Sequence, residues 1–73
     1  MDAAELSNRF TFHPAVGTQP GRYQRIRDKA GELAALISEL TPESREQSLA
    51  ITACEEASMW ANAAIARREN TIA

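Results

Sequence analysis

Apolar residues recur at helical spacing through two long segments of the chain. In the first segment they are three or four residues apart, a heptad-type pattern that predicts a helix over about residues 22–40, paired with another helix. These positions are Tyr23, Ile26, Ala30, Leu33, Ile37 and Leu40. The second segment, Ser48 to Arg68, is rich in Ala and contains neither Gly nor Pro, so it also predicts a helix.

The short connection between the two segments predicts how they are arranged. Thr41 is a suitable N-cap and Pro42 fits the first helical position, so the second helix is expected over about residues 42–68. Because only a few residues join the helices, they should fold back on each other as an antiparallel hairpin. We therefore expect an all-α protein with a helical hairpin over residues 22–69.

The first 21 residues are expected to form an N-terminal arm and loop. Met1–Glu5 is polar, which indicates a frayed end or a short helical lead. From Arg9 to Pro14, aromatic and polar residues alternate, and the residue before a proline favours extended backbone, so this segment predicts an extended arm. Ala15 to Gly21 contains two Gly and one Pro and predicts a loop. Residues 70–73 should form a loose tail.

The second helix is apolar on more than one face. Leu49 and Trp60 mark one face, and Ile51 and Ile65 mark another. A helix that is apolar almost all round must be covered on several sides, and a 73-residue chain has little other material for this. The pattern therefore predicts that several copies of the chain associate, with Trp60 in the core or at an interface between copies.

Composition excludes several classes of protein. A net charge of −2 argues against a general DNA- or RNA-binding protein. No run approaches the ~20 apolar residues of a membrane span, and the N-terminus lacks the pattern of a signal peptide, so we expect a cytoplasmic protein. Cys54 is the only cysteine and His13 the only histidine, which excludes an internal disulfide and a structural zinc site. Cys54 lies in the apolar helix and indicates a small buried side chain.

The sequence offers little for catalysis or cofactor binding. It contains no Gly-rich phosphate loop and no HExxH motif, and its adjacent carboxylates, Glu55 and Glu56, point to different sides of a helix. His13 precedes a proline, and Cys54 shows no sign of activation. We expect a protein that is not an enzyme and that uses no metal or other cofactor.

Cations concentrate at the end of the hairpin where the arm enters. Only Arg45 falls elsewhere; the others are Arg9, Arg22, Arg25, Arg27, Lys29, Arg67 and Arg68. Acidic residues gather at the hairpin tip instead, at Glu39, Glu43 and Glu46. An electropositive end suits a small polyanion. The alternative is that these cations only complement the helix dipole or form a solvated face.

Two other features near this end also have two interpretations. Phe10 and Phe12 are either apolar staples or surfaces on which a nucleotide base stacks. Gly31 lies within the first helix at a cost of ~1 kcal/mol relative to Ala. It is either a tolerated or closely packed Gly, or a place where a ligand or another backbone comes close.

Three segments together resemble a known family. They are FTFHP at 10–14, RYQRIRDKAGELA at 22–34 and TPESREQSLAITACEEASMWANAAIAR at 41–67. They are similar to small phage proteins that defeat CBASS immunity by sequestering its cyclic-oligonucleotide messengers, and to the related Thoeris anti-defence sponges. The resemblance implies helical hairpins assembled into a hexamer in the cytoplasm of the infected bacterial host.

The resemblance also implies two kinds of ligand site. Cyclic dinucleotides would bind between paired protomers, at Phe12, His13, Arg25 and Lys29, with Phe12 stacked on a base and Lys29 at the phosphates. The family often has Tyr at the position of Phe12, so this chain lacks that hydroxyl. Cyclic trinucleotides would bind near three-fold axes, with Arg67 facing the ligand and Arg27, Gly31 and Arg68 nearby.

Two other functions remain open at this stage. One is a helical oligomerisation or regulatory module that binds no nucleotide. The other is a DNA-binding regulator, which the acidic balance and a hairpin without an evident recognition helix disfavour.

Overall fold

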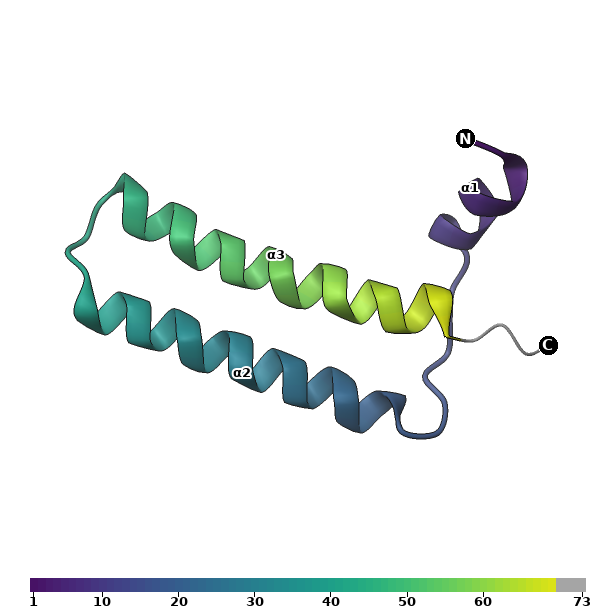
Figure 1. Cartoon of the computed structure of the whole chain (residues 1–73), viewed down its shortest axis with the longest axis horizontal. Helices are drawn as coiled ribbons and strands as arrows, with labels where there is room; N and C mark the ends of the chain where they lie inside the picture. The colour runs from purple at the N-terminus through teal and green to yellow at the C-terminus, as the bar shows by residue number, and fades with distance from the viewer. Residues whose placement is uncertain (70–73) are drawn as a thin grey trace.

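In the computed structural model, which describes residues 1–69, the chain forms three helices and no strand over that range. α1 spans Ala3–Phe10, α2 spans Gln19–Leu40 and α3 spans Arg45–Arg68. α2 and α3 lie side by side and antiparallel, and α1 projects from the open end of this hairpin (Figure 1). The predicted all-α helical hairpin is confirmed. The tail predicted at 70–73 lies outside the described residues.

The N-terminal arm begins with a helix, which is one of the two alternatives predicted for Met1–Glu5. Asp2 caps α1, because its Oδ1 accepts a hydrogen bond from the backbone N–H of Glu5 at 2.8 Å. Arg9 and Phe10 form the last turn of α1, so the prediction of extended structure from Arg9 is wrong at these two residues. The chain becomes extended at Thr11, whose hydroxyl donates to a carbonyl one turn earlier at 2.6 Å.

A buried glutamine fixes the start of α2, which begins at Gln19 rather than near residue 22. Gly17, at φ 58°, makes the turn before it, in a region of backbone conformation that glycine adopts without strain. Gln19 is only 5% exposed. Its Oε1 accepts from the N–H of Val16 at 3.1 Å, and its Nε2 donates to the carbonyl of Ile65 at 3.5 Å. This side chain therefore joins the loop to α3.

The hairpin tip is capped differently from the prediction. Ser44 is the N-cap of α3 and accepts from the N–H of Gln47 at 3.1 Å, so α3 begins at Arg45 and not at position 42. Thr41 instead ends α2, where its hydroxyl donates to the carbonyl of Ile37 at 2.6 Å. The prediction that Thr41 caps the second helix is wrong. Both residues are suitable caps, and each closes a different helix.

The heptad pattern of α2 describes the packed side only in part. Tyr23, Ile26, Ala30 and Ile37 are half-buried, whereas Leu33 and Leu40 are 50% and 70% exposed. Ala34 is half-buried beside the exposed Leu33. A straight α-helix has 3.6 residues per turn rather than 3.5, so a strict heptad drifts off the contact line over several turns. The predicted positions Leu33 and Leu40 are therefore wrong as parts of the seam within one protomer.

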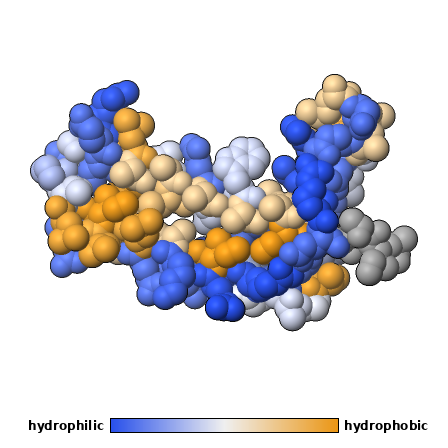
Figure 2. Space-filling model, viewed as in Figure 1, coloured by the Kyte–Doolittle hydropathy of each residue, from blue (hydrophilic) through white to orange (hydrophobic). Residues whose placement is uncertain are grey.

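One protomer has very little core. Among residues 1–69, the buried hydrophobic residues are Cys54 and Ile65, which are 8% and 9% exposed, and the burial predicted for Cys54 is confirmed. Trp60 is 66% exposed, so of its two predicted places the protomer core is wrong, and an interface between copies stays a prediction. The chain exposes 5678 Å², whereas a compact protein of its mass is expected to expose about 4,500 Å². Figure 2 shows apolar surface along the hairpin, continuous near its tip.

No described helix combines the length and apolarity that a membrane span needs.

Candidate functional site

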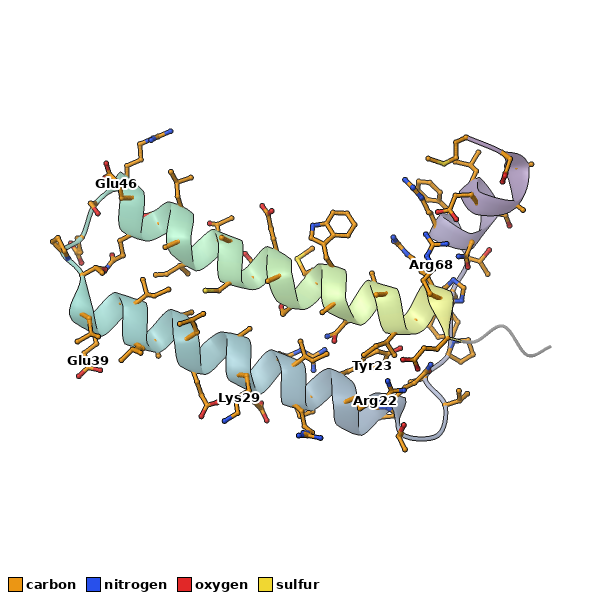
Figure 3. The ribbon with its side chains drawn as sticks, in the orientation of Figure 1. Arg22, Tyr23, Lys29, Glu39, Glu46 and Arg68 are labelled. Atoms are coloured by element: carbon orange, nitrogen blue, oxygen red, sulfur yellow. The ribbon has the colours of Figure 1, made fainter. Side chains whose placement is uncertain are left out.

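The two ends of the hairpin differ in charge. Figure 3 shows Arg22 and Arg68 at the open end, where α2 begins and α3 finishes, and Glu39 and Glu46 toward the tip. This separation is the one that the order of charges along the sequence predicts, because an antiparallel hairpin brings the first turns of α2 next to the last turn of α3.

Arg68 is held by a carboxylate on α1. Its Nη1 and Nη2 donate to the two carboxylate oxygens of Glu5, both at 2.7 Å, and Arg9 Nε donates to Glu5 Oε2 at 2.7 Å. The hydrogen bonds from Arg68, and then from Arg9, lower the pKa of Glu5 to about 2. A two-pronged contact of this kind fixes the guanidinium in one orientation. In the free protomer, Arg68 is therefore already paired.

Two other cations at this end are also paired. Arg22 donates through Nη1 and Nη2 to the carboxylate of Glu69 at 2.6 Å each, which lowers the pKa of that carboxyl. Lys29 Nζ lies 3.1 Å from Glu32 Oε2, and both side chains are mostly exposed. Arg22 thus bridges the start of α2 and the residue after α3, while the Lys29 pair is a solvent-screened contact that an anion can displace.

An open groove, called here the arm groove, lies where the arm meets α2 and α3. Its lining combines aromatic, cationic and amide side chains with small apolar ones; the residues are Arg9, Thr11, Phe12, His13, Tyr23, Arg27, Met59, Asn62, Ala63, Ala66 and Arg67. Phe12 is 84% exposed here. Within residues 1–69, neither Arg27 nor Arg67 forms an ion pair, so both charges are available to an anion.

Hydrogen bonds hold the arm against the end of α3. His13 donates through Nε2 to the carbonyl of Asn8 at 2.8 Å, and Asn8 Nδ2 donates to the carbonyl of Arg67 at 3.1 Å. The arm residues around Phe12 are therefore tied to the same turn of α3 that carries Arg67. This connection explains how the segment after α1, which has no regular structure of its own, can present an aromatic ring at a fixed place.

A second groove, the α2 groove, runs along the first half of α2. It is lined by Arg22, Arg25, Ile26, Asp28, Lys29, Glu32 and Ile65. The structure thus brings Phe12 and His13 together with Arg27 and Arg67, and places Arg25 and Lys29 on the other groove of the same protomer. The residues that the resemblance assigns to dinucleotides are therefore divided between the two grooves, and of those assigned to trinucleotides only Arg27 and Arg67 lie together in the arm groove.

The remaining predicted residues lie apart from both grooves. Arg68 lines a third groove with Phe10 and Trp60, between α1 and α3. Gly31 lies in the middle of α2 and lines none of the three grooves described. A Cβ at this position would meet no atom within 4 Å. Packing within the protomer therefore gives no reason for a glycine here.

Sequence reasoning missed Asn62 and Gln19. Asn62 is a polar residue within the Ala-rich part of α3, and that contrast is a signal the sequence does carry. Gln19 stands in a Gly- and Pro-containing segment that is typical of a loop, and its burial depends on contacts with distant residues.

Over residues 1–69, no group of three or more His, Cys, Asp or Glu side chains could hold a metal ion.

Comparison with protein families gives a match to the family described as Acb2/Tad1, hairpin domain, over residues 2–66. No curated protein and no solved structure matches the chain. The family match includes α1, α2 and all of α3 except its last two residues, Arg67 and Arg68. The resemblance recognised in the sequence is confirmed: the chain belongs to the Acb2/Tad1 hairpin-domain family of cyclic-nucleotide sponges, which act against CBASS and Thoeris defence.

Proposed function

We propose that this protein binds and sequesters the cyclic dinucleotide and trinucleotide messengers of bacterial CBASS defence without cleaving them. The observation that carries the proposal, beside family membership, is an exposed aromatic ring next to two unpaired guanidinium groups in the arm groove. The ring of Phe12 can stack on a base, and the guanidinium groups of Arg27 and Arg67 can give charge-assisted hydrogen bonds to phosphates. Bases and phosphates are the two kinds of group that every cyclic oligonucleotide offers.

Sequestration requires affinity rather than chemistry. A nanomolar dissociation constant corresponds to ~12 kcal/mol of binding free energy. Sites that are ordered before the ligand arrives reach such values more readily, because fewer groups lose freedom on binding. The hydrogen bonds from His13 to Asn8 and from Asn8 to Arg67 order the arm in advance. A messenger held in this way cannot reach its effector.

In this proposal the site is completed by other copies of the chain, in a hexamer. Sparse burial and exposed Trp60, Leu40 and Leu49 favour association, because the apolar surface must be covered. Pairing two protomers can set the arm groove of one beside the α2 groove of the other. The dinucleotide would then contact Phe12 and His13 from one copy and Arg25 and Lys29 from its partner. Trinucleotides would use Arg27, Gly31, Arg67 and Arg68 near a three-fold axis.

The proposed setting is the cytoplasm of a phage-infected bacterium, where the messengers are made. Membrane surfaces and polymeric DNA or RNA are not proposed as partners. The net charge of −2 disfavours a duplex, whose binding gains most of its strength from many phosphate contacts. A small cyclic ligand needs only a few cations.

Two phenylalanines provide a matched test. Phe10 and Phe12 are both 84% exposed, but only Phe12 lines the arm groove. Calorimetric titration with cyclic di-AMP, cyclic di-GMP and cyclic tri-AMP should show that Phe12→Ala weakens binding of the preferred dinucleotide by about tenfold to a hundredfold, the effect of losing one stacked base. Phe10→Ala should retain the wild-type affinity. Equal affinities for the two variants would contradict the proposed stacking role.

The exposed apolar surface by itself favours a second function, a helical interaction module with no nucleotide ligand. That function predicts an oligomer that binds none of the three cyclic nucleotides. Sedimentation of the same samples used in the titration separates the two functions. A ligand-binding oligomer supports the sponge, and an oligomer without any titration heat supports the module.

A further inference from the structure

One buried atom in the arm groove has no partner. Asn62 Oδ1 is shielded from solvent and accepts no hydrogen bond, and it is the one such side-chain atom among residues 1–69. Asn62 projects from α3 and lines the groove together with Phe12, Arg27 and Arg67. A carbonyl oxygen buried without a donor carries its full desolvation cost. The unpaired oxygen thus lies beside the groups proposed to hold the ligand.

Local structure gives no reason for an asparagine at this position. The neighbouring helical positions Ala61, Ala63 and Ala64 are all alanine, the residue most favourable to a helix, whereas asparagine is among the less favourable. A polar residue within a helix usually points to solvent or bonds to a nearby carbonyl. The buried oxygen of Asn62 can do neither. A residue that breaks local rules without local compensation marks a functional position.

A second buried amide side chain at the same end of the hairpin, Gln19, behaves differently. Gln19 is almost fully buried, yet its oxygen accepts from Val16 and its nitrogen donates to Ile65. Its side chain is accounted for by the fold alone. The contrast shows that this end of the protomer can satisfy a buried amide, and that it leaves the oxygen of Asn62 for a donor from outside.

The groove restricts what that donor can be. Phosphate groups carry acceptors only, and they are attracted to Arg27 and Arg67. The surfaces next to Asn62 are the apolar side chains of Met59, Ala63 and Ala66, which suit the flat faces of a base. A base lying against them presents its edge to the amide. Among groups on that edge, an exocyclic amine offers two N–H donors to a carbonyl oxygen.

We propose that Asn62 is a specificity-determining residue that accepts a hydrogen bond from the exocyclic amine of a bound base. This assignment rests on the proposed function, because it requires a cyclic nucleotide in the arm groove. The oxygen is left unpaired in the free protein and is satisfied only by the correct ligand. A base without the amine leaves it buried and unpaired, so the site rejects that base.

The test compares ligands that differ in the exocyclic amine alone. For cyclic di-AMP the matched ring is the cyclic dinucleotide of unsubstituted purine, which lacks the 6-amino group, and for cyclic di-GMP it is cyclic di-inosine monophosphate, which lacks the 2-amino group. The wild type should bind whichever amine-bearing dinucleotide it prefers about tenfold more tightly than the matched ring without the amine. Asn62→Leu, of similar size but without the acceptor, should bind both rings with nearly equal affinity. Thr52→Val, an isosteric change on the same helix outside the three grooves, should keep the wild-type ratio.

Thermal unfolding without ligand adds an independent readout. Because Asn62→Leu removes an unpaired buried oxygen, its melting temperature should rise by several degrees above that of the wild type. A fall in melting temperature, or dissociation to a smaller species in sedimentation, would overturn the assignment, since the amide would then serve the fold or a contact between copies. A wild-type ratio of affinities in Asn62→Leu would overturn it as well. If the wild type binds cyclic tri-AMP but none of these dinucleotides, this assignment fails and the proposed function stands for trinucleotides; if it binds no cyclic nucleotide, both fail.

Discussion

The buried side chain of Gln19 should make a large contribution to the stability of the open end. Gln19→Ala leaves the N–H of Val16 without its acceptor at 3.1 Å and the carbonyl of Ile65 without a longer contact at 3.5 Å. The Ile65 carbonyl retains a bond from the N–H of Glu69 at 3.4 Å, so the main loss is at Val16. The bond from Val16 is only part-buried, so its net contribution is about 0.5–1.5 kcal/mol. Since about 1 kcal/mol shifts the melting temperature of a domain this small by about 4–8 °C, we expect a decrease of about 2–12 °C.

The matched control is a glutamine on the same helix. Gln24 is exposed and its Nε2 donates to Asp28 Oδ1 at 2.7 Å, so Gln24→Ala removes a bond that water replaces. That change should stay within about 0.5 kcal/mol of the wild type. Circular dichroism melts at one fixed protein concentration provide the comparison, because association makes the melting temperature depend on concentration. If Gln19→Ala melts no lower than Gln24→Ala, then the buried amide does not fasten the loop to α3.

Three further outcomes follow from the described contacts. Carboxyl NMR should give Glu5 a pKa of about 2, and Arg68→Gln should raise this pKa toward 4.5; an unchanged pKa would contradict the pairing. Because the pKa of Glu5 is lower in the folded state, the stability from this pair is present above about pH 4.5 and is lost as the pH falls toward 2. Gly31→Ala should raise the melting temperature by several degrees, since alanine favours a helix by ~1 kcal/mol and its Cβ meets no atom of the protomer within 4 Å. A melting temperature below that of the wild type would show that another copy packs at this glycine. Arg27→Ala should weaken cyclic tri-AMP binding in calorimetry by at least about tenfold. Arg45→Ala removes a tip cation that forms no ion pair within residues 1–69 and should leave this affinity unchanged. Equal effects would mean that only total charge matters.

The long helices could be predicted because their signals are local. Spacing of apolar residues and the absence of Gly and Pro from Ser48 to Arg68 suffice for both α2 and α3. The N-cap of α3 is harder to predict from the sequence, because Thr41 and Ser44 are equally suitable and the choice depends on which of them ends α2. The start of α1 also has a local signal, because Asp2 followed three residues later by Glu5 is a common start of a helix.

The candidate site was predictable in its parts and not in its pairing. The aromatic residues and cations at the open end follow from composition and hairpin topology. The pairing of Arg68 with Glu5 joins residues 63 positions apart, so no local pattern predicts it. The orientation of the arm likewise depends on the bond from Asn8 to the carbonyl of Arg67. Asn62 is visible in the sequence, but only the surroundings of its oxygen show that it lacks a partner.

The most direct measurement of the central claim is recovery of ligand from the protein. Purified protein is incubated with a cyclic dinucleotide or trinucleotide, separated from free ligand and heat-denatured, and the released nucleotide is identified by mass spectrometry. Sequestration predicts that the intact ring is recovered in a fixed ratio to the protein. Recovery of a linear or otherwise cleaved product would show that the protein is an enzyme, and recovery of no nucleotide at all would show that it is not a sponge for these rings.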